Sequence, residues 1–376
     1  MKIPQVLRVA KRRSTRAVRS ATQRAVVRGV LRRVLTYPAD AREGAAGKRL
    51  PHFLIARYNY YAADAAMGPS IEEFLLDNTL RAAQLGTVDT FFWETDSGRF
   101  PRGDWALLEK CRSVRPDAII LSSYEPGYRT QPSVEAIRLL RQTWNIPIIA
   151  VWWDTCYDGF WQSIQPIMPF VDVHVIPDNP LMNFFDQYTR PRYEGRFLPL
   201  WEAMDPLMYN NPGLNRDIDV AFLGQVAGYR SVRMQYLQHL MENNVPLFCS
   251  MFNRAEQPTH EKYLNVLKRS KIGLNFSQSV HSDQLKSRVF ETMSCGALLM
   301  ENDNPQTRCY FTPMTDYVSF DSPADLVDKI RHYLAHGDAR VEIAARGEQK
   351  IRQLYDHAHF WTAILNKLAS VKNVPL

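Results

Sequence analysis

The sequence predicts an α/β protein with two facing Rossmann-like domains, a cleft between them, and a basic amphipathic helix at the N-terminus. Short apolar runs alternate with helical patterns in two successive series. Asp205-Pro206 and Asn211-Pro212-Gly213 interrupt the pattern between the two series. The length of 376 residues is sufficient for two domains. We therefore expect one domain over 52–205 and a second over 206–376.

The first domain is expected to contain a parallel sheet, because strands that alternate with helices of this length form βαβ units. The predicted strands are 52–58, 90–93, 117–122, 147–153 and 171–176, and the predicted helices are 70–86, 105–114, 134–143 and 181–188. The helix 70–86 begins with Ser70-Ile71-Glu72-Glu73, an S-x-x-E sequence that predicts a capping box.

The second domain repeats the same alternation. The predicted strands are 218–223, 245–250, 272–276, 297–300 and 317–320, and the predicted helices are 232–242, 261–268 and 285–294. A further helix is expected to begin at Ser322-Pro323, with serine as the N-cap and proline in the first turn. The helical pattern resumes at about 341 and continues to the end of the chain.

The first 36 residues, called the arm below, carry eleven lysines and arginines and no acidic residue, although the net charge of the whole chain is only +7. The apolar residues of the arm at helical spacing are Val27, Val30, Leu31, Val34 and Leu35. Such an amphipathic helix suits an anionic membrane surface, where each basic residue contributes about 1 kcal/mol. A protein partner and a solvated or partly disordered arm are the alternatives. Residues 37–51 form the predicted linker.

Composition excludes several classes of protein. No stretch has the roughly 18 consecutive apolar residues of a membrane span. The five cysteines are scattered and form no CxxC pair, so we expect neither a disulfide framework nor a zinc site. The chain beyond the arm is mildly acidic, which argues against nucleic acid as a partner. We expect a cytoplasmic protein that can lie, through residues 1–36, against the inner face of the cell membrane.

Three acidic residues follow predicted strands of the first domain: Asp154, Glu125 and Asp178. Ligands of an open α/β sheet bind beyond the carboxyl ends of its strands, where a carboxylate can accept a proton from a hydroxyl group. Asp154 is the principal candidate, with a helix N-cap as its structural alternative.

The first turn of the second domain is a candidate phosphate-binding site. Gly224 ends the strand 218–223, and a strand–glycine–helix connection can place backbone N–H groups against a phosphate. Arg230 and Arg233 follow and can add positive charge. Glycine also ends many ordinary strands and exposed arginines are common, so structural roles remain open for all three.

The helix 285–294 carries the most informative pair of charged residues. Arg288 and Glu291 are three residues apart and share one flank of the helix. At a cleft, the guanidinium can pair with phosphate oxygens while the carboxylate accepts both ribose hydroxyls. On an isolated helix the same two residues would form a surface ion pair.

Residues of this domain resemble the C-terminal domain of the GT-B glycosyltransferases, in particular the group-1 transferases that include the spore-maturation-like CgeB proteins. The matching sequences are Asp219–Gly224 (DVAFLG), Ile272–Phe276 (IGLNF), Arg288–Glu291 (RVFE), Cys295–Ala297 (CGA), Ala324–Ile330 (ADLVDKI) and Ala344–Gly347 (AARG). Phe197–Trp201 (FLPLW) is similar to the interdomain crossing of that family.

The resemblance implies roles for individual residues. Many retaining GT-B enzymes carry two glutamates separated by seven residues, and Glu291 matches the second, which binds the donor ribose. Asp283 stands at the first position and is one methylene shorter than glutamate. Arg288 and Lys286 match the basic residues that bind phosphate. The family generally uses no cofactor or bound metal, and positive side chains and helix N-termini would stabilise the leaving diphosphate.

The resemblance therefore implies a metal-independent, retaining glycosyltransferase of the hexosyltransferase type. The donor would be a UDP- or GDP-sugar bound by the second domain, and the acceptor a surface polysaccharide or lipid-linked glycan bound by the first. Asp154 and Asp283 would be catalytic, and Gly224, Arg230, Lys286, Arg288 and Glu291 would bind the donor. A GT-B-fold nucleotide-sugar epimerase and a catalytically degenerate binding protein are the alternatives.

Overall fold

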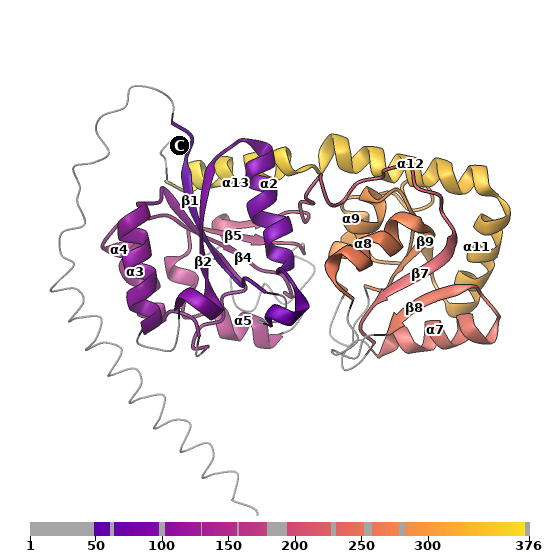
Figure 1. Ribbon diagram of the computed structural model, residues 1–376, viewed down its shortest axis with the longest axis horizontal. Coiled ribbons are helices and arrows are strands. Elements are labelled where there is room, and N and C mark those ends of the chain that lie inside the picture. The colour runs from indigo at the N-terminus through magenta and orange to yellow at the C-terminus, as the bar shows by residue number, and fades with distance from the viewer. Residues whose placement is uncertain are drawn as a thin grey trace, which may run out of the picture.

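The computed structural model describes residues 49–60, 64–97, 102–128, 130–155, 158–178, 194–226, 231–251, 258–277 and 283–372. The arm, the predicted linker up to residue 48 and the predicted helix 181–188 lie outside these ranges. Figure 1 shows the described chain as two lobes side by side, each built on its own sheet. No helix in the described ranges combines the length and the apolar character that a membrane span requires.

The first domain is a six-stranded parallel sheet in the order β2-β1-β3-β4-β5-β6. Its strands are β1 (His52–Arg57), β2 (Thr87–Phe92), β3 (Ala118–Ser122), β4 (Ile148–Val151), β5 (Val173–Ile176) and β6 (Phe197–Pro199). The strands β3, β4 and β5 are completely buried, as expected for a parallel sheet with both faces covered. Its helices are α2 (Asn78–Ala83), α3 (Arg102–Val114), α4 (Val134–Gln142) and α5 (Asp158–Ile164).

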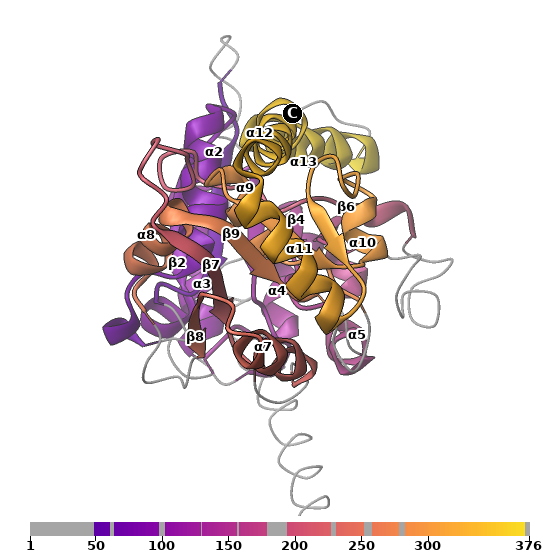
Figure 2. The same ribbon diagram turned by 90° about the vertical axis from the view of Figure 1, so that its right-hand side faces the viewer.

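The second domain is a five-stranded parallel sheet in the order β11-β10-β9-β7-β8. Its strands are β7 (Ile218–Gly224), β8 (Leu247–Met251), β9 (Ser270–Asn275), β10 (Leu298–Asn302) and β11 (Val318–Phe320). Its helices are α7 (Val232–Glu242), α8 (His260–Arg269), α9 (Ser287–Ser294), α10 (Pro305–Arg308), α11 (Pro323–Ala335) and α12 (Gly337–Leu354). Figure 2 views this domain end-on, with α7 and α11 in front of the strands. The strands predicted from apolar runs are confirmed, and α11 begins at the predicted Ser322 cap, whose hydroxyl accepts the N–H of Asp325 at 3.1 Å.

The prediction of an S-x-x-E capping box at Ser70–Glu73 is wrong. The N–H of Ser70 donates to the carbonyl of Asn59 at 2.9 Å, so it is not available to a glutamate three residues later. Glu73 instead pairs with Arg57 at 3.6 Å, and the Ser70 hydroxyl oxygen accepts the N–H of Glu72 at 3.3 Å. Residues Glu73–Asp77 then form a π-helical turn before α2. Tertiary partners of the first turn override the local pattern.

The last helix, α13 (His357–Lys372), leaves the second domain and packs on the first, and Figure 1 shows the chain ending there. Trp361 is completely buried, donates its indole N–H to the hydroxyl of Thr79 at 3.0 Å and packs against Phe53. We expected residues 206–376 to form the second domain, but α13, which belongs to this range, packs on the first domain. One hydrophobic cluster therefore includes residues of α2, α9 and α13 and joins the two domains.

We expect Trp361→Ala to lower the free energy of unfolding by about 3–5 kcal/mol, because truncation of a buried tryptophan leaves a cavity. Urea denaturation followed by circular dichroism measures the change. Thr362→Ala, on the exposed side of the same helix, is the matched control and should stay within about 0.5 kcal/mol of the wild type. Equal stabilities of the two variants would contradict the docking of α13.

Candidate active site

The carboxyl ends of both parallel sheets face a cavity of about 440 Å³ between the domains. Ligand sites of open α/β sheets are found in this position. The first domain and the crossing contribute Tyr58, Tyr60, Pro69, Ser70, Ile71, Glu72, Leu75, Ser123, Trp153, Asp154 and Glu202. The second domain contributes Leu223, Gly224, Gln225, Arg233, Pro258, His260, Tyr263, Gln284, Leu285, Lys286, Ser287, Arg288 and Glu291.

The N-terminus of α9 faces this cavity. Lys286 occupies the N-cap position with an extended backbone, and a lysine side chain cannot accept a hydrogen bond from the first turn. The N–H groups and the positive end of the helix dipole therefore favour an anion at this point. Lys286, Arg288 and Glu291 all line the cavity, because they share the first turns of one helix.

Arg288 is held in a fixed orientation by its neighbours. Its Nη1 donates to Oδ1 of Asn275 at 3.0 Å, and its guanidinium carbon lies 5.5 Å from the centre of the Phe222 ring. A Cβ atom at Gly224 would lie 2.7 Å from Nη2 of Arg288. Glycine at 224 therefore makes room for the guanidinium, a role that the strand–glycine–helix pattern did not indicate.

Glu291 is a buried carboxylate, with 4% of its surface exposed. Burial raises the pKa of its carboxyl group, while the hydrogen bond from the Tyr263 hydroxyl and the charge of Arg288 act in the opposite direction. Tyr263, on α8, was not a sequence candidate. Its hydroxyl orients one carboxylate oxygen of Glu291, as expected for a side chain that must present a fixed hydrogen-bonding edge.

Asp154 meets the second domain directly. Its side chain is 50% exposed, and Oδ1 lies 3.4 Å from Nζ of Lys286 and 3.3 Å from Nε2 of Gln284. The amide of Gln284 also donates to the carbonyl of Trp153 at 3.0 Å. The sequence-predicted residues of the two domains are thus brought together at one point of the cleft.

The other predicted carboxylates lie elsewhere. Asp178 is 1% exposed, and its oxygens accept the N–H of Leu285 at 2.7 Å and the hydroxyl of Thr155 at 2.6 Å, so it connects the two domains. Burial raises its pKa to about 6. Glu125 is exposed and Asp283 is half-buried, and neither is among the residues that line the cavity.

Arg230 and Arg233 were both predicted to add positive charge at a phosphate site. Arg230 lies outside the described residues. Arg233 lines the cavity and is buried, and its guanidinium donates to the carbonyls of Gln225 and Phe276, each at 2.9 Å. These two bonds hold the ends of β7 and β9 together, which is a structural role in addition to any contact with a ligand.

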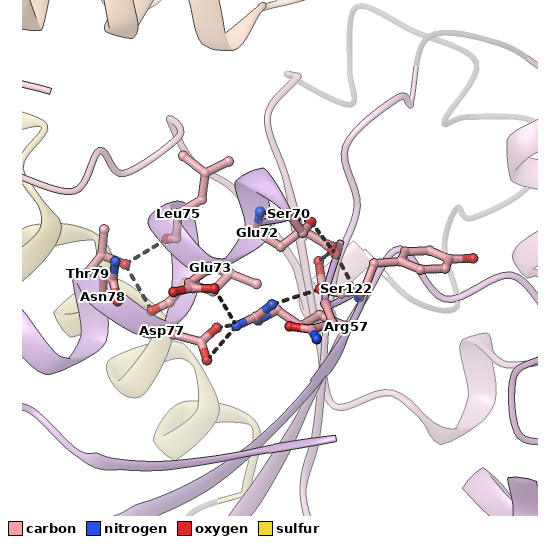
Figure 3. A network of polar contacts seen from close by, with 12 residues as sticks. Arg57, Ser70, Glu72, Glu73, Leu75, Asp77, Asn78, Thr79 and Ser122 are labelled. Carbon is pink, nitrogen blue, oxygen red and sulfur yellow. Dashed lines mark hydrogen bonds and ion pairs between the residues drawn. The ribbon is translucent and has the colours of Figure 1, made fainter. Parts of the chain in front are cut away.

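Glu72 forms the centre of a polar network on the first-domain side, which Figure 3 shows from close by. Its carboxylate accepts the N–H of Tyr58 at 2.9 Å and the hydroxyls of Ser123 at 2.7 Å, Ser70 at 3.3 Å and Ser122. Four donors fix the orientation of this side chain. The capping-box pattern gave a role to the adjacent Glu73 and none to Glu72.

A buried ion pair between Arg57 and Asp77 adjoins this network. Arg57 donates from Nε and Nη2 to the two oxygens of Asp77, at 2.6 and 3.1 Å, and its Nη1 donates to the carbonyl of Tyr58 at 2.7 Å. Burial raises the pKa of Asp77, and the two hydrogen bonds and the charge of Arg57 oppose this shift. The bidentate geometry fixes the end of β1 from which Tyr58 enters the cavity.

Glu202 is a further residue that the sequence did not indicate. It follows the predicted crossing sequence, is 6% exposed and lines the cavity. Burial raises the pKa of its carboxyl group to about 8, although a hydrogen bond with Ser287 lowers it. Oε2 of Glu202 has no hydrogen-bond partner within the described part of the chain.

The described residues contain no group of three or more His, Cys, Asp or Glu side chains arranged to hold a metal ion. The positive groups at the cavity wall are the side chains of Lys286, Arg288 and Arg233.

The comparisons with known proteins concern the family and the fold. Residues 218–366 match the family model described as glycosyl transferase-like. The sequence has no match among the curated proteins.

Solved structures share the fold of the whole described chain. HepE of Anabaena, solved with UDP and glucose, superposes with a TM-score of 0.57 at 10% identity, covering 85% of this chain and 100% of its own. Sucrose-phosphate synthase from Thermosynechococcus elongatus gives 0.57 at 14% identity, with 86% and 100% covered. A glycosyltransferase from Rickettsia africae gives 0.57 at 9% identity, with 87% and 99% covered. The chain therefore has the GT-B fold that these structures share, and its residues 218–366 are similar to the glycosyl transferase-like family.

Proposed function

We propose that the protein transfers a sugar from a nucleotide-sugar donor to a hydroxyl group of a glycan or glycolipid. The observation that carries this proposal is the meeting of Lys286, Arg288 and Glu291, at the start of α9, with Asp154 across the interdomain cavity. Cations, a helix N-terminus and a buried carboxylate on one side suit a nucleoside diphosphate. The half-exposed carboxylate on the other side suits an incoming hydroxyl group.

The donor is proposed to bind the second domain. The diphosphate would lie against the first turn of α9, between Lys286 and Arg288, and the ribose hydroxyls would bind Glu291. The positive charges that stabilise the leaving diphosphate would then come from the protein, so we propose that transfer needs no metal ion. UDP and UDP-glucose appear in the titles of the HepE structures, and UDP is therefore our first choice of nucleotide.

The acceptor is proposed to bind the first domain. Tyr58, Tyr60 and Trp153 line that half of the cavity and can stack on the apolar faces of sugar rings. Asp154 would orient the acceptor hydroxyl and take up its proton. The bond between C1 of the sugar and the diphosphate oxygen would break as the new glycosidic bond forms. We propose that the anomeric configuration is preserved, which requires the acceptor hydroxyl to attack C1 from the same face that the diphosphate leaves.

A lipid-linked acceptor in surface-polysaccharide assembly accords with the basic arm of the sequence. The arm would hold the protein at the membrane face where such acceptors are presented. The proposed location is the cytoplasmic side of the cell membrane.

A bound donor should raise the stability of the folded protein. One class among UDP-, GDP-, CMP- and dTDP-sugars should stabilise the wild type by about 2.7 kcal/mol at 100 times its dissociation constant. Glu291→Ala should lose this stabilisation, whereas Glu242→Ala, an exposed residue of α7, should keep it. Thermal unfolding measures the effect. A folded wild type that responds to none of the four classes would refute the donor site, and conversion of the donor without an acceptor would favour the epimerase.

Asp154→Asn should separate chemistry from donor binding. We expect transfer to fall about 100-fold, because the proton acceptor is removed, while donor affinity changes by less than about threefold. Initial rates and equilibrium titration with the donor make the two measurements. Asp328→Asn, on the exposed side of α11, is the matched control. An equal loss of affinity and rate would show that Asp154 acts only through its contact with Lys286.

Gly224→Ala tests the space beside Arg288. The added methyl group would displace the guanidinium, and we expect the affinity for the nucleoside diphosphate to fall about tenfold, equivalent to about 1.4 kcal/mol. Gly195→Ala is the control, because a Cβ there would meet no atom within 4 Å. Calorimetric titration measures both variants. Unchanged affinity in Gly224→Ala would argue against a fixed Arg288 as a ligand of the diphosphate.

A further inference from the structure

Glu202 is a buried carboxyl group at the wall of the cavity, with incomplete hydrogen bonding. The residue is 6% exposed and its Oε2 atom has no partner within the described part of the chain. Its other interaction is a hydrogen bond with the side chain of Ser287, the first residue of α9. The side chain with this unpaired oxygen therefore contacts the first residue of the helix whose N-terminus favours an anion.

The charged groups that face Glu202 are mostly negative. Glu291 approaches from α9, Asp154 from the loop after β4, and Lys286 from the segment before α9. Lys286 is itself in contact with Asp154 and with the side chain of Gln284. An ionised Glu202 would place a buried negative charge near Glu291 and Asp154, with Lys286 as the opposing cation, which is unfavourable.

The neutral form of Glu202 suits this environment. Burial raises the pKa of the carboxyl group to about 8, so it carries its proton at neutral pH. A carboxylic acid has one O–H donor, whereas a carboxylate has none. A bound diphosphate would favour the neutral form further, because it brings more negative charge to the same place.

We propose that Glu202 binds the donor as a neutral carboxylic acid and donates a hydrogen bond to an oxygen atom of the diphosphate at the N-terminus of α9. This inference rests on the proposed nucleotide-sugar site and adds one residue and one proton to it. Lys286 and Arg288 recognise the charge of the diphosphate, and Glu202 supplies a donor that binds only in its protonated state.

Two consequences distinguish this role from simple burial. Affinity for the diphosphate should decline as Glu202 ionises, since only the protonated fraction of the protein binds. Glutamine, which keeps a donor of similar shape and cannot ionise, should replace glutamate with little loss. Alanine should not.

The test uses the full chain, with UDP and GDP as probes, in calorimetric titrations at pH 7 and pH 9. For the nucleotide that binds, wild-type affinity should fall about tenfold between these values. Glu202→Gln should bind within about threefold of the wild type at pH 7 and lose less than about twofold by pH 9, whereas Glu202→Ala should bind at least about tenfold more weakly at pH 7. A tenfold decline that persists in Glu202→Gln would overturn the proposal and assign the titration to another group, such as Lys286.

A measurement on the wild type alone guards against variants that do not fold. Titration at pH 8.5 in buffers of different ionisation enthalpy should reveal the uptake of about three quarters of a proton on binding. Binding without proton uptake would refute the role of Glu202 and leave the donor site intact. Absence of binding by either nucleotide at pH 7 would instead reject the donor site itself, together with this inference.

Discussion

The hydrogen bonds of Asp178 set the geometry on which the rest of the cleft depends. Its carboxylate is buried in the first domain and accepts the backbone N–H of Leu285, which belongs to the second. Leu285 immediately precedes Lys286 and the first turn of α9. The position of α9 is therefore fixed relative to the loop that carries Asp154. A bond of this kind is specific because the N–H and the carboxylate would both be costly to bury without a partner.

Much of the fold could be predicted from the sequence, because strands and long helices depend on local pattern. The helix 232–242 was predicted with its observed bounds, and the apolar runs of both sheets were found. The capping box failed, because the N–H of Ser70 has a backbone partner that is distant in the chain. The return of α13 to the first domain was missed for the same reason, since nothing in a helical pattern states which surface it will cover.

The residues of the candidate site could likewise be predicted only in part. Lys286, Arg288 and Glu291 could be predicted together because one helix carries them at fixed spacing. Glu72 and Glu202 come from separate elements that only the folded chain brings to the cavity. The position of a carboxylate after a strand could not distinguish Asp154, which lines the cavity, from Asp178, which joins the domains.

The carboxyl groups around the cavity differ in what surrounds them, and this decides what each can do. Glu72 has four hydrogen-bond donors and is held as an acceptor, so it organises the first-domain wall. Glu291 is oriented by Tyr263 and lies near Arg288. Glu202 is buried with one open oxygen, which favours a retained proton.

Asp154 is the carboxylate that remains half exposed, and it pairs with Lys286 at a moderate distance of 3.4 Å. Such a pair is weak enough for an incoming ligand to replace it. An anion that draws Lys286 towards α9 would leave the hydrogen bond from Gln284 to Asp154 in place. Under the proposed function, donor binding would therefore change the charge beside Asp154 while the orientation of its side chain stays supported.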